Sequence, residues 1–462
     1  MAEIYRRSNK VVVWLGEEAD DSSYAMSCIN GIDCRLASRS SKLKEDRRAA
    51  ARKFDNRAFR ATYQLLLRPW WSRSWIIQEA TCGNETDLRC GSDVTNFVAV
   101  VAVINCMLQV LLPSLQNDSS LDIRHLQRVV ALDQLKIERA RPQYRSNMMG
   151  LLDQFRTGAA SDPRDKIFAL SALATGAEET AANPDYSISV DKAYAKFAYN
   201  LIMYGGNLDI LGHCQVAVRT IHSWSQFKLL TTDLIPERTL PSWIPDWTEL
   251  QETTPFPKCE WPDDVGSQKL YKSTGQFLPS AKLAKGFDTL FIRGFTFDRI
   301  RSTSPDASPV SPTISIQSWK TWVETELGST SMRCGTLLDV FSHTITADIS
   351  AVGGRWMRGS KAKVLGTTAS GIIPEWSDEM SVIRMTVHSR RLFYSEKGYL
   401  GLARYDAKVG DKICLLHGGS VPYILRQDDE SCHLFKGECY VHGLMDGEGM
   451  RFPHVWEDFA LH

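Results

Sequence analysis

The sequence has no net charge and no long uninterrupted hydrophobic run. Lys plus Arg and Asp plus Glu each number 54 among 462 residues, which argues against a general electrostatic attraction to nucleic acid or to an anionic membrane surface. The longest apolar stretch, Phe97–Leu112, contains Asn105 and Gln109 and falls short of the roughly 20 residues that a spanning helix needs. We therefore expect a buried helix there, no membrane span and no nucleic-acid partner.

A disulfide framework is also absent. The 11 cysteines are odd in number and follow no framework spacing in this long chain, which favours reduced thiols in a cytoplasmic protein. Cys414-x2-His417 and Cys439-x2-His442 contain the ligand types that zinc prefers. Residues three apart on a strand point to opposite faces, however, so we predict buried strand cysteines, turn histidines and no metal.

Several sequence motifs for nucleotide binding and catalysis are missing. There is no P-loop, no dinucleotide-binding glycine fingerprint and no nucleophile elbow, so we expect no cofactor. Basic residues gather between Arg35 and Arg68, but no recognition motif accompanies them. A solvated helix face explains this cluster better than a nucleic-acid contact.

The first 205 residues predict helices around a small parallel sheet. Val11–Leu15 is a continuous apolar run, typical of a strand buried on both faces. Helical spacing predicts one helix over Lys44–Leu67, and Asp93 is a suitable cap for the apolar helix. Further helices are expected at Ile123–Arg139, Met148–Phe155, Pro163–Ala174 and Val190–Met203.

The composition changes in the second half of the chain. Ser302–Thr313 is rich in Ser and Pro and is typical of a linker. From about Arg391, short apolar segments alternate with glycine turns and predict a small antiparallel β domain. The predicted organisation is a core at 1–175, a helical extension at 176–250, a variable region at 251–384 that contains the linker at 302–313, and a small β domain at 385–462.

Five segments, in this order, resemble the fungal heterokaryon-incompatibility (HET) family. They are IYRRSNKVVVWLG (4–16), RPWWSRSWIIQEATCG (68–83), SDPRDKIFALSALA (161–174), PDYSISVDKAYAKFA (184–198) and LPSWIPDW (240–247), and the tail segments at 409–426 and 437–448 are similar to the family's C-terminal region. The resemblance implies an α/β fold with a partial, distantly TIR-like HET core. The family's opening strands, of the form ALSYxWG and WIDAxCINQ, have no counterpart, so we expect an N-terminally truncated core in which the edge of Val11–Leu15 is exposed.

The resemblance also implies a function. HET proteins act in nonself recognition and trigger programmed cell death or growth arrest when incompatible cells fuse. We therefore expect protein partners, either other HET-domain proteins or a second copy of this chain. A non-catalytic alternative is an adaptor that binds intact HET partners by adding a strand at the exposed sheet edge.

An enzymatic alternative centres on Glu79. SRSWIIQE (72–79) resembles the glutamate-bearing helix of catalytic TIR domains, which implies an NAD glycohydrolase with NAD as its substrate and Glu79 as its carboxylate. Trp75, four residues earlier, shares a helix face with Glu79, and Trp71 and Trp75 could stack a nicotinamide ring. The competing interpretations are that Glu79 pairs with Arg68 or Arg73 at the surface and that the tryptophans belong to the core.

Two further motifs favour structural roles. Asp162 before Pro163 is a good helix cap with proline at the first helical position, and we prefer this to a role for Arg164 as a ligand clamp. Trp243 and Trp247, in a segment stiffened by prolines, are expected to anchor the core.

Overall fold

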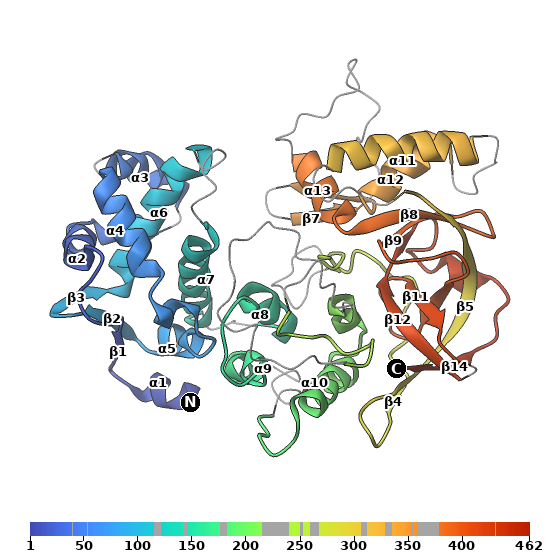
Figure 1. The fold of residues 1–462 in the computed structure, drawn as a ribbon, viewed down its shortest axis with the longest axis horizontal. Helices are drawn as coiled ribbons and strands as arrows, with labels where there is room; N and C mark the ends of the chain where they lie inside the picture. The colour runs from blue at the N-terminus through green and yellow to red at the C-terminus, as the bar shows by residue number, and fades with distance from the viewer. Residues whose placement is uncertain are drawn as a thin grey trace. The chain divides into compact units, whose positions relative to one another are not determined.

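The computed structural model describes residues 1–38, 40–52, 54–114, 122–141, 146–175, 183–214, 240–249, 253–258, 268–305, 312–328, 335–352, 355–358, 378–429 and 431–462. The chain divides into two compact units, Met1–Asn183 and Pro184–His462, which are the blue-to-green and green-to-red parts of Figure 1. No helix in the described ranges is long and apolar enough to cross a membrane.

The first unit consists of helices and one small sheet. Its helices and short 3₁₀ turns (η) are α1 (Ala2–Arg7), α2 (Ser22–Asn30), η1 (Cys34–Ala37), η2 (Ser41–Leu43), α3 (Lys44–Ala51), α4 (Asn56–Leu66), η3 (Pro69–Ser72), α5 (Ile76–Cys82), α6 (Phe97–Ser114), α7 (Arg124–Arg139), α8 (Met148–Phe155) and α9 (Asp165–Ser171). Its strands are β1 (Lys10–Trp14), β2 (Glu85–Cys90) and β3 (Asp93–Asn96).

The sheet has the order β1-β2-β3, with β1 parallel to β2 and β2 antiparallel to β3. The prediction that the first strand is buried on both faces is wrong. Val11 and Val13 are buried, whereas Val12 and Trp14 are 59% and 52% exposed, so β1 alternates like a strand with one covered face. Three adjacent valines in the sequence could not reveal this, because burial of a face depends on which elements pack against it.

Two helices differ from the prediction: one is interrupted, and the other begins at a different residue. The helix expected over Lys44–Leu67 is interrupted between α3 and α4, because Asp55 adopts an extended conformation and its side chain caps α4 by accepting from the Ala58 N–H at 2.6 Å. Asp93 does not cap the apolar helix but begins β3; Asn96 precedes α6, and its side chain accepts from the Val98 N–H at 2.7 Å.

The core of the first unit forms around α6. Residues Val100–Ile104 of this helix are all at most 1% exposed, as expected for a helix that is apolar on every side. Helices α2, α3 and α7 pack against α6. The buried helix predicted from Phe97–Leu112 is therefore confirmed as the centre of this unit.

The second unit joins a few helices to a large sheet. Its helices are α10 (Val190–Gly205), η6 (Asp209–His213), α11 (Pro312–Leu327), α12 (Leu337–Ile345), α13 (Asp378–Val387) and η7 (Glu448–Arg451). Its strands are β4 (Ala281–Leu283), β5 (Leu290–Thr303), β6 (Ile349–Val352), β7 (Arg355–Arg358), β8 (Arg390–Ser395), β9 (Leu400–Arg404), β10 (Lys412–Leu416), β11 (Tyr423–Gln427), β12 (Cys432–Glu438), β13 (Tyr440–Val441) and β14 (Glu457–Leu461).

Five strands of this unit close into a ring. The pairing runs from β10 through β11, β12, β14 and β5 and returns from β5 to β10; β12 and β14 are parallel and the other pairs of the ring are antiparallel. Gly294 lies where β5 meets β10, and a Cβ there would approach the Leu415 carbonyl oxygen to 2.6 Å, so only glycine allows this close approach. The predicted C-terminal β domain is thus a mainly antiparallel barrel.

The barrel takes strands from outside the range 385–462. β4 and β5 come from the region expected to be variable, and β5 extends through Ser302 and Thr303 at the start of the expected linker; residues 306–311 of that linker lie outside the described ranges. Local sequence could not show that β5 belongs to the barrel, since its partners β8, β10 and β14 lie about a hundred residues or more further along.

Candidate functional site

The predicted catalytic residue Glu79 lies in the first turn of α5 and is half-buried. Its Oε2 accepts a hydrogen bond of 2.7 Å from the indole Nε1 of Trp70, which is 6% exposed. Tyr5 on α1 lies beside it: burial, and then the charge of Glu79, raise the pKa of the Tyr5 phenol. The carboxylate is therefore held between α1, η3 and α5 by an indole donor.

The tryptophans around Glu79 divide between core and surface. Trp70 and Trp71 meet edge to face with ring centroids 4.8 Å apart, and Trp71 is 2% exposed and stacks on Phe97 of α6. Trp75 is the half-buried residue that precedes α5. The structure thus brings Trp70, Trp71 and Glu79 together, but it places Trp71 in the core, where it cannot stack an entering ring without displacement of Phe97.

The arginines expected as alternative partners of Glu79 lie elsewhere. Arg68 donates to the Ala19 carbonyl at 3.0 Å and lies 3.8 Å from Asp20. Arg73 receives a hydrogen bond from Arg128 at its carbonyl oxygen. Of the described residues, neither arginine forms an ion pair with Glu79, so the indole of Trp70 takes the place that the sequence assigned to a cation.

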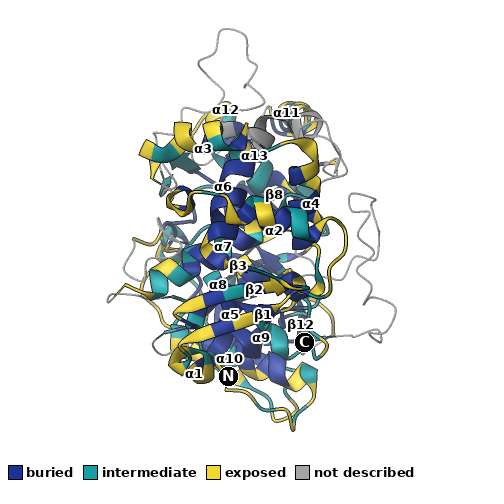
Figure 2. Ribbon diagram, turned by 90° about the vertical axis from the view of Figure 1, so that its left-hand side faces the viewer, coloured by how far each residue is buried: buried dark blue, intermediate teal, exposed yellow. Residues whose placement is uncertain are grey.

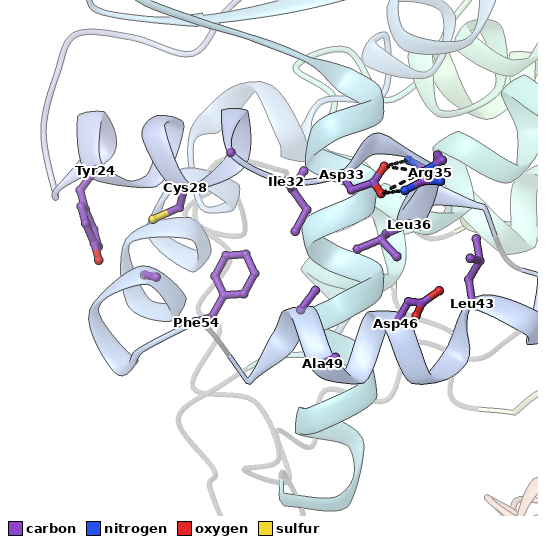
Figure 3. Close-up of a pocket in the computed structure, with 13 residues that line it drawn as sticks. Tyr24, Cys28, Ile32, Asp33, Arg35, Leu36, Leu43, Asp46, Ala49 and Phe54 are labelled. Atoms are coloured by element: carbon purple, nitrogen blue, oxygen red, sulfur yellow. Dashed lines mark hydrogen bonds and ion pairs between the residues drawn. The ribbon is translucent and has the colours of Figure 1, made fainter.

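A cavity of about 600 Å³ lies in another part of the first unit. Figure 3 shows it between α2, the segment 31–36, α3 and α4, with Tyr24, Cys28, Ile32, Leu36 and Phe54 along its wall. The rim carries an ion pair between Asp33 and Arg35 at 2.7 Å, and Glu79, Trp71 and Trp75 are not among the lining residues. The lining mixes apolar side chains with three charged ones, Asp33, Arg35 and Asp46, so it does not by itself identify a ligand.

Sequence reasoning missed this cavity because it assigned no element to residues 22–43. The signal was present in Ala25 and Ile29, which are four residues apart and both fully buried on α2. Tyr24 and Cys28, offset by one residue, form the next stripe of the same helix and face the cavity. Two stripes of this kind predict a short amphipathic helix, although they do not predict the cavity itself.

A second polar centre lies inside the second unit. Arg390 and Glu438 are 1% and 5% exposed at the side chain and lie 3.8 Å apart; Lys258 also pairs with Glu438. The Arg390 guanidinium lies 4.0 Å over the ring of Phe256, and its Nη atoms donate to the backbone carbonyls of Thr386 and Thr254. These buried charges tie the segment 253–258 and α13 to β8 and β12, so their arrangement serves the fold, and loss of one partner would leave the other charge uncompensated.

The four residues of the zinc hypothesis do not converge. Cys414 and Cys439 are fully buried among the barrel strands, and burial raises the pKa of Cys414 to about 12. His417 stacks on Phe277 at 4.7 Å, whereas His442 stacks on His343 at 5.3 Å. Within the described ranges, no group of three or more His, Cys, Asp or Glu side chains is arranged to hold a metal ion.

The two motifs with predicted structural roles form a turn before α9 and part of the core of the second unit. Asp162 accepts from the Arg164 N–H at 2.9 Å and pairs with its guanidinium at 2.7 Å, and α9 begins at Asp165, so the predicted helix starts two residues late because this turn precedes it. Trp243 and Trp247 are 0% and 1% exposed. They anchor the core of the second unit, as predicted, and the Trp243 indole donates to the Asp288 carbonyl at 3.0 Å.

Comparison with known proteins finds a similarity in each of the two units. The model of the "Heterokaryon incompatibility protein (HET)" family matches residues 1–79, and the "Het-6 beta-barrel domain" model matches residues 367–461. The chain is 22% identical over 560 residues to "Heterokaryon incompatibility protein 6, OR allele" of Neurospora crassa, and the alignment covers 100% of this chain and 79% of that protein. No solved structure matches. The two matches lie in the two units that the structure separates, so the chain is similar to heterokaryon-incompatibility proteins in both: to the HET domain in the first unit and to the Het-6 β-barrel in the second.

Proposed function

We propose that this chain acts in heterokaryon incompatibility, as a cytoplasmic nonself-recognition protein whose effect is growth arrest or death of cells that fuse with an unlike strain. The observation that carries the proposal is the pairing of a HET match with a Het-6 barrel match in one chain, together with an alignment to a heterokaryon incompatibility protein along its whole length.

Expression of the full chain in a filamentous fungus tests this function. The chain, under an inducible promoter, is placed in one of two strains that otherwise form a healthy heterokaryon, and growth is measured after fusion and in each strain alone. We expect arrest that depends on fusion. The matched control is Phe459→Ala, which removes a 1% exposed side chain from the closing strand β14. Equal growth with and without the chain, in strains of several genotypes, would contradict the proposal.

The enzymatic alternative makes a separate prediction. NAD cleavage needs a carboxylate and a site that positions the nucleotide, whereas Glu79 is bonded to Trp70 and is not among the residues that line the cavity. We therefore expect the purified chain to release no nicotinamide from NAD. Release that disappears in Glu79→Gln, but persists in the exposed control Glu45→Gln, would establish the NAD glycohydrolase instead.

One observation favours the adaptor as a second candidate function. Within the described ranges, β1 pairs with β2 along one edge and no strand covers the other. An uncovered strand edge accepts a strand of another protein through main-chain hydrogen bonds. The adaptor function predicts that this chain co-purifies with an intact HET protein and that substitution of Val12 by Pro abolishes the complex.

A further inference from the structure

The shortest junction in the ring of the barrel lies between β12 and β14. Cys432 pairs with Ala460, and His433 pairs with Leu461, whereas the other neighbouring strands of the ring pair over three or five positions. The N–H of His462 donates to the His433 carbonyl at 3.0 Å, and Figure 2 shows the end of the chain beside β12. We call this junction, at which β14 closes the ring, the seam.

Three side chains from three strands meet at the seam. His433 of β12 is 7% exposed, and its Nε2 lies 2.8 Å from the Nζ of Lys412 on β10. The ring of Phe459 on β14 meets the imidazole edge to face, with centroids 5.3 Å apart, and the Lys412 Nζ lies 5.9 Å from the same ring. The imidazole therefore links β12 to β10 through a hydrogen bond and to the closing strand through ring packing.

The contact with Lys412 fixes the protonation state of the imidazole. A lysine ammonium is a donor only, so Nε2 of His433 accepts this hydrogen bond, and the ring is neutral with its proton on Nδ1. The Gln427 Oε1 also accepts from the ammonium, at 2.8 Å, which holds Lys412 in place. A second proton could bind the imidazole only at Nε2, where it would replace the hydrogen bond with two adjacent cations.

The charged groups around His433 do not remove this conflict. They are Lys412 on β10, Glu457 on β14 and Asp429 in the turn before β12, and the exposed His462 follows β14. Burial, and then Lys412, lower the pKa of His433, although Glu457 and Asp429 act in the opposite direction. Once water reaches the ring, its pKa returns to the ordinary value of about 6.5. Because the closed form binds the proton less readily than an open form, a fall in pH below about 6.5 favours the open form.

We propose that His433 is an acid-sensitive latch of the barrel, which holds β14 against β12 while its imidazole is neutral and releases the seam when the imidazole takes a second proton. The proton comes from solvent and binds at Nε2, and the hydrogen bond from Lys412 breaks. Repulsion then drives the imidazole out of its buried site, and Phe459 loses the ring that packs on it. Since two residue pairs form the seam, this junction has the fewest backbone pairs to resist the change. The latch does not rest on the function proposed above.

Amide hydrogen exchange of the purified full chain between pH 7.5 and 5.0 measures the opening. After correction for the intrinsic exchange rate, exchange in peptides from 432–438 and 457–462 should increase by up to about tenfold per pH unit below about 6.5, because opening is linked to binding of one proton. Exchange in α6 of the first unit is the internal reference and should stay constant. The series stops at pH 5, where ordinary carboxyl groups remain ionised.

Two substitutions test the role of the imidazole. In His433→Gln, the amide oxygen can still accept from Lys412 but cannot be protonated, so exchange at the seam should change by less than about twofold over the series. Lys412→Met removes the cation that opposes protonation, and its seam should open less in acid than that of wild type. His388→Gln, at an exposed histidine after α13, is the matched control and should keep the wild-type response.

A reversible cross-link tests the seam without changing His433. Residue 460 lies opposite Cys432, and adjacent strands are about 4.8 Å apart, which is within the range for a disulfide. Oxidised Ala460→Cys is expected to keep exchange at the seam low at pH 5, and reduction of the disulfide should restore the response to acid.

The latch is refuted if exchange at the seam is the same at pH 7.5 and 5.0 in the wild-type chain. An undiminished response to acid in His433→Gln, or in Lys412→Met if the first variant does not fold, would also refute it. Equal acid-dependent exchange in the oxidised and reduced forms of Ala460→Cys would place the opening elsewhere in the barrel and exclude the seam.

Discussion

At the scale of single residues, Glu79 shows how one neighbour decides the role of a carboxylate. The motif around it resembles that of an enzyme, yet its Oε2 receives the indole N–H of Trp70 at 2.7 Å in a setting where Trp70 is 6% exposed. A buried N–H that loses its acceptor costs more free energy than the bond itself contributes. The local sequence cannot supply this contact, because nine residues and a 3₁₀ turn separate the partners.

We expect Glu79→Ala to lower the free energy of unfolding by about 1–3 kcal/mol, because it leaves the Trp70 indole N–H without its acceptor. Urea denaturation followed by tryptophan fluorescence measures the change. In a double-mutant cycle, Trp70→Phe together with Glu79→Ala should cost less than the sum of the single changes. The exposed Glu45→Ala serves as control and should change stability by less than about 0.5 kcal/mol. Additive losses would show that the bond contributes nothing.

At the scale of elements, caps and turns decide where helices begin. The helical spacing of residues 44–67 is continuous, but Asp55 adopts an extended backbone and starts α4 with its own side chain. N-capping by Asp competes with continuation of the helix, because the Asp side chain accepts a hydrogen bond from a backbone N–H at the start of a new helix. The same effect places Asn96, rather than Asp93, at the start of α6.

Replacement of Asp55 by Ala should destabilise the first unit by about 1 kcal/mol, because the Ala58 N–H loses the side chain that caps it at 2.6 Å. Asp55→Asn keeps an acceptor at the same place and is expected to be close to wild type. Chemical denaturation of the three chains measures both differences. A loss of equal size in the Ala and Asn variants would indicate that charge, not capping, matters at this position.

Asp406, which follows β9, gives the barrel a pH dependence. Burial alone would raise the pKa of this carboxyl, but hydrogen bonds and charges from Arg404 at 2.7 Å and Lys436 at 3.0 Å outweigh it and lower the pKa to about 2. Because the folded value lies below the unfolded value of 3.8, the ionised carboxylate stabilises the fold above about pH 4. This stabilisation is lost as the pH falls from about 4 toward 2.

Asp406→Asn is therefore expected to lower the free energy of unfolding by about 2 kcal/mol at pH 7, with a difference from wild type that shrinks below pH 4. Urea unfolding at pH 7, 5, 4 and 3 measures it. Asp458→Asn is the control: its side chain is 60% exposed and pairs with Arg293 at 3.3 Å, so it should cost less than about 0.5 kcal/mol. A difference independent of pH would refute the electrostatic explanation.

At the scale of the whole molecule, the chain has two cores. The first unit forms around the apolar helix α6, and the second forms within the closed ring of β5, β10, β11, β12 and β14. The match to the Het-6 barrel begins at residue 367, yet β5, from 290–303, pairs with β10 and β14 and completes the ring. The structural unit is therefore larger than the family match.

Two cores predict two unfolding transitions. Phe459 on β14 is 1% exposed, so Phe459→Ala should cost about 3–5 kcal/mol in the second unit and leave the first unit unaffected. Differential scanning calorimetry should then show one transition at lower temperature and one unchanged. Val455→Ala, at a residue that is 85% exposed, is the control and should move neither. A single transition that shifts as a whole would contradict independent cores.

The sequence alone determined what depends on neighbours along the chain and on recognisable motifs. The helix at Met148–Phe155 was predicted with its observed bounds, and α10 begins at the predicted Val190 behind the cap Ser189. The order of motifs indicated the resemblance to HET proteins that the family comparison also finds in residues 1–79. The tertiary structure decided what depends on residues far apart in the sequence. It exposed one face of β1, placed β5 and β14 in one ring, and brought Lys258, Arg390 and Glu438 together. Strand pairing and buried ion pairs depend on the free energy of the whole fold, so local sequence patterns do not predict them.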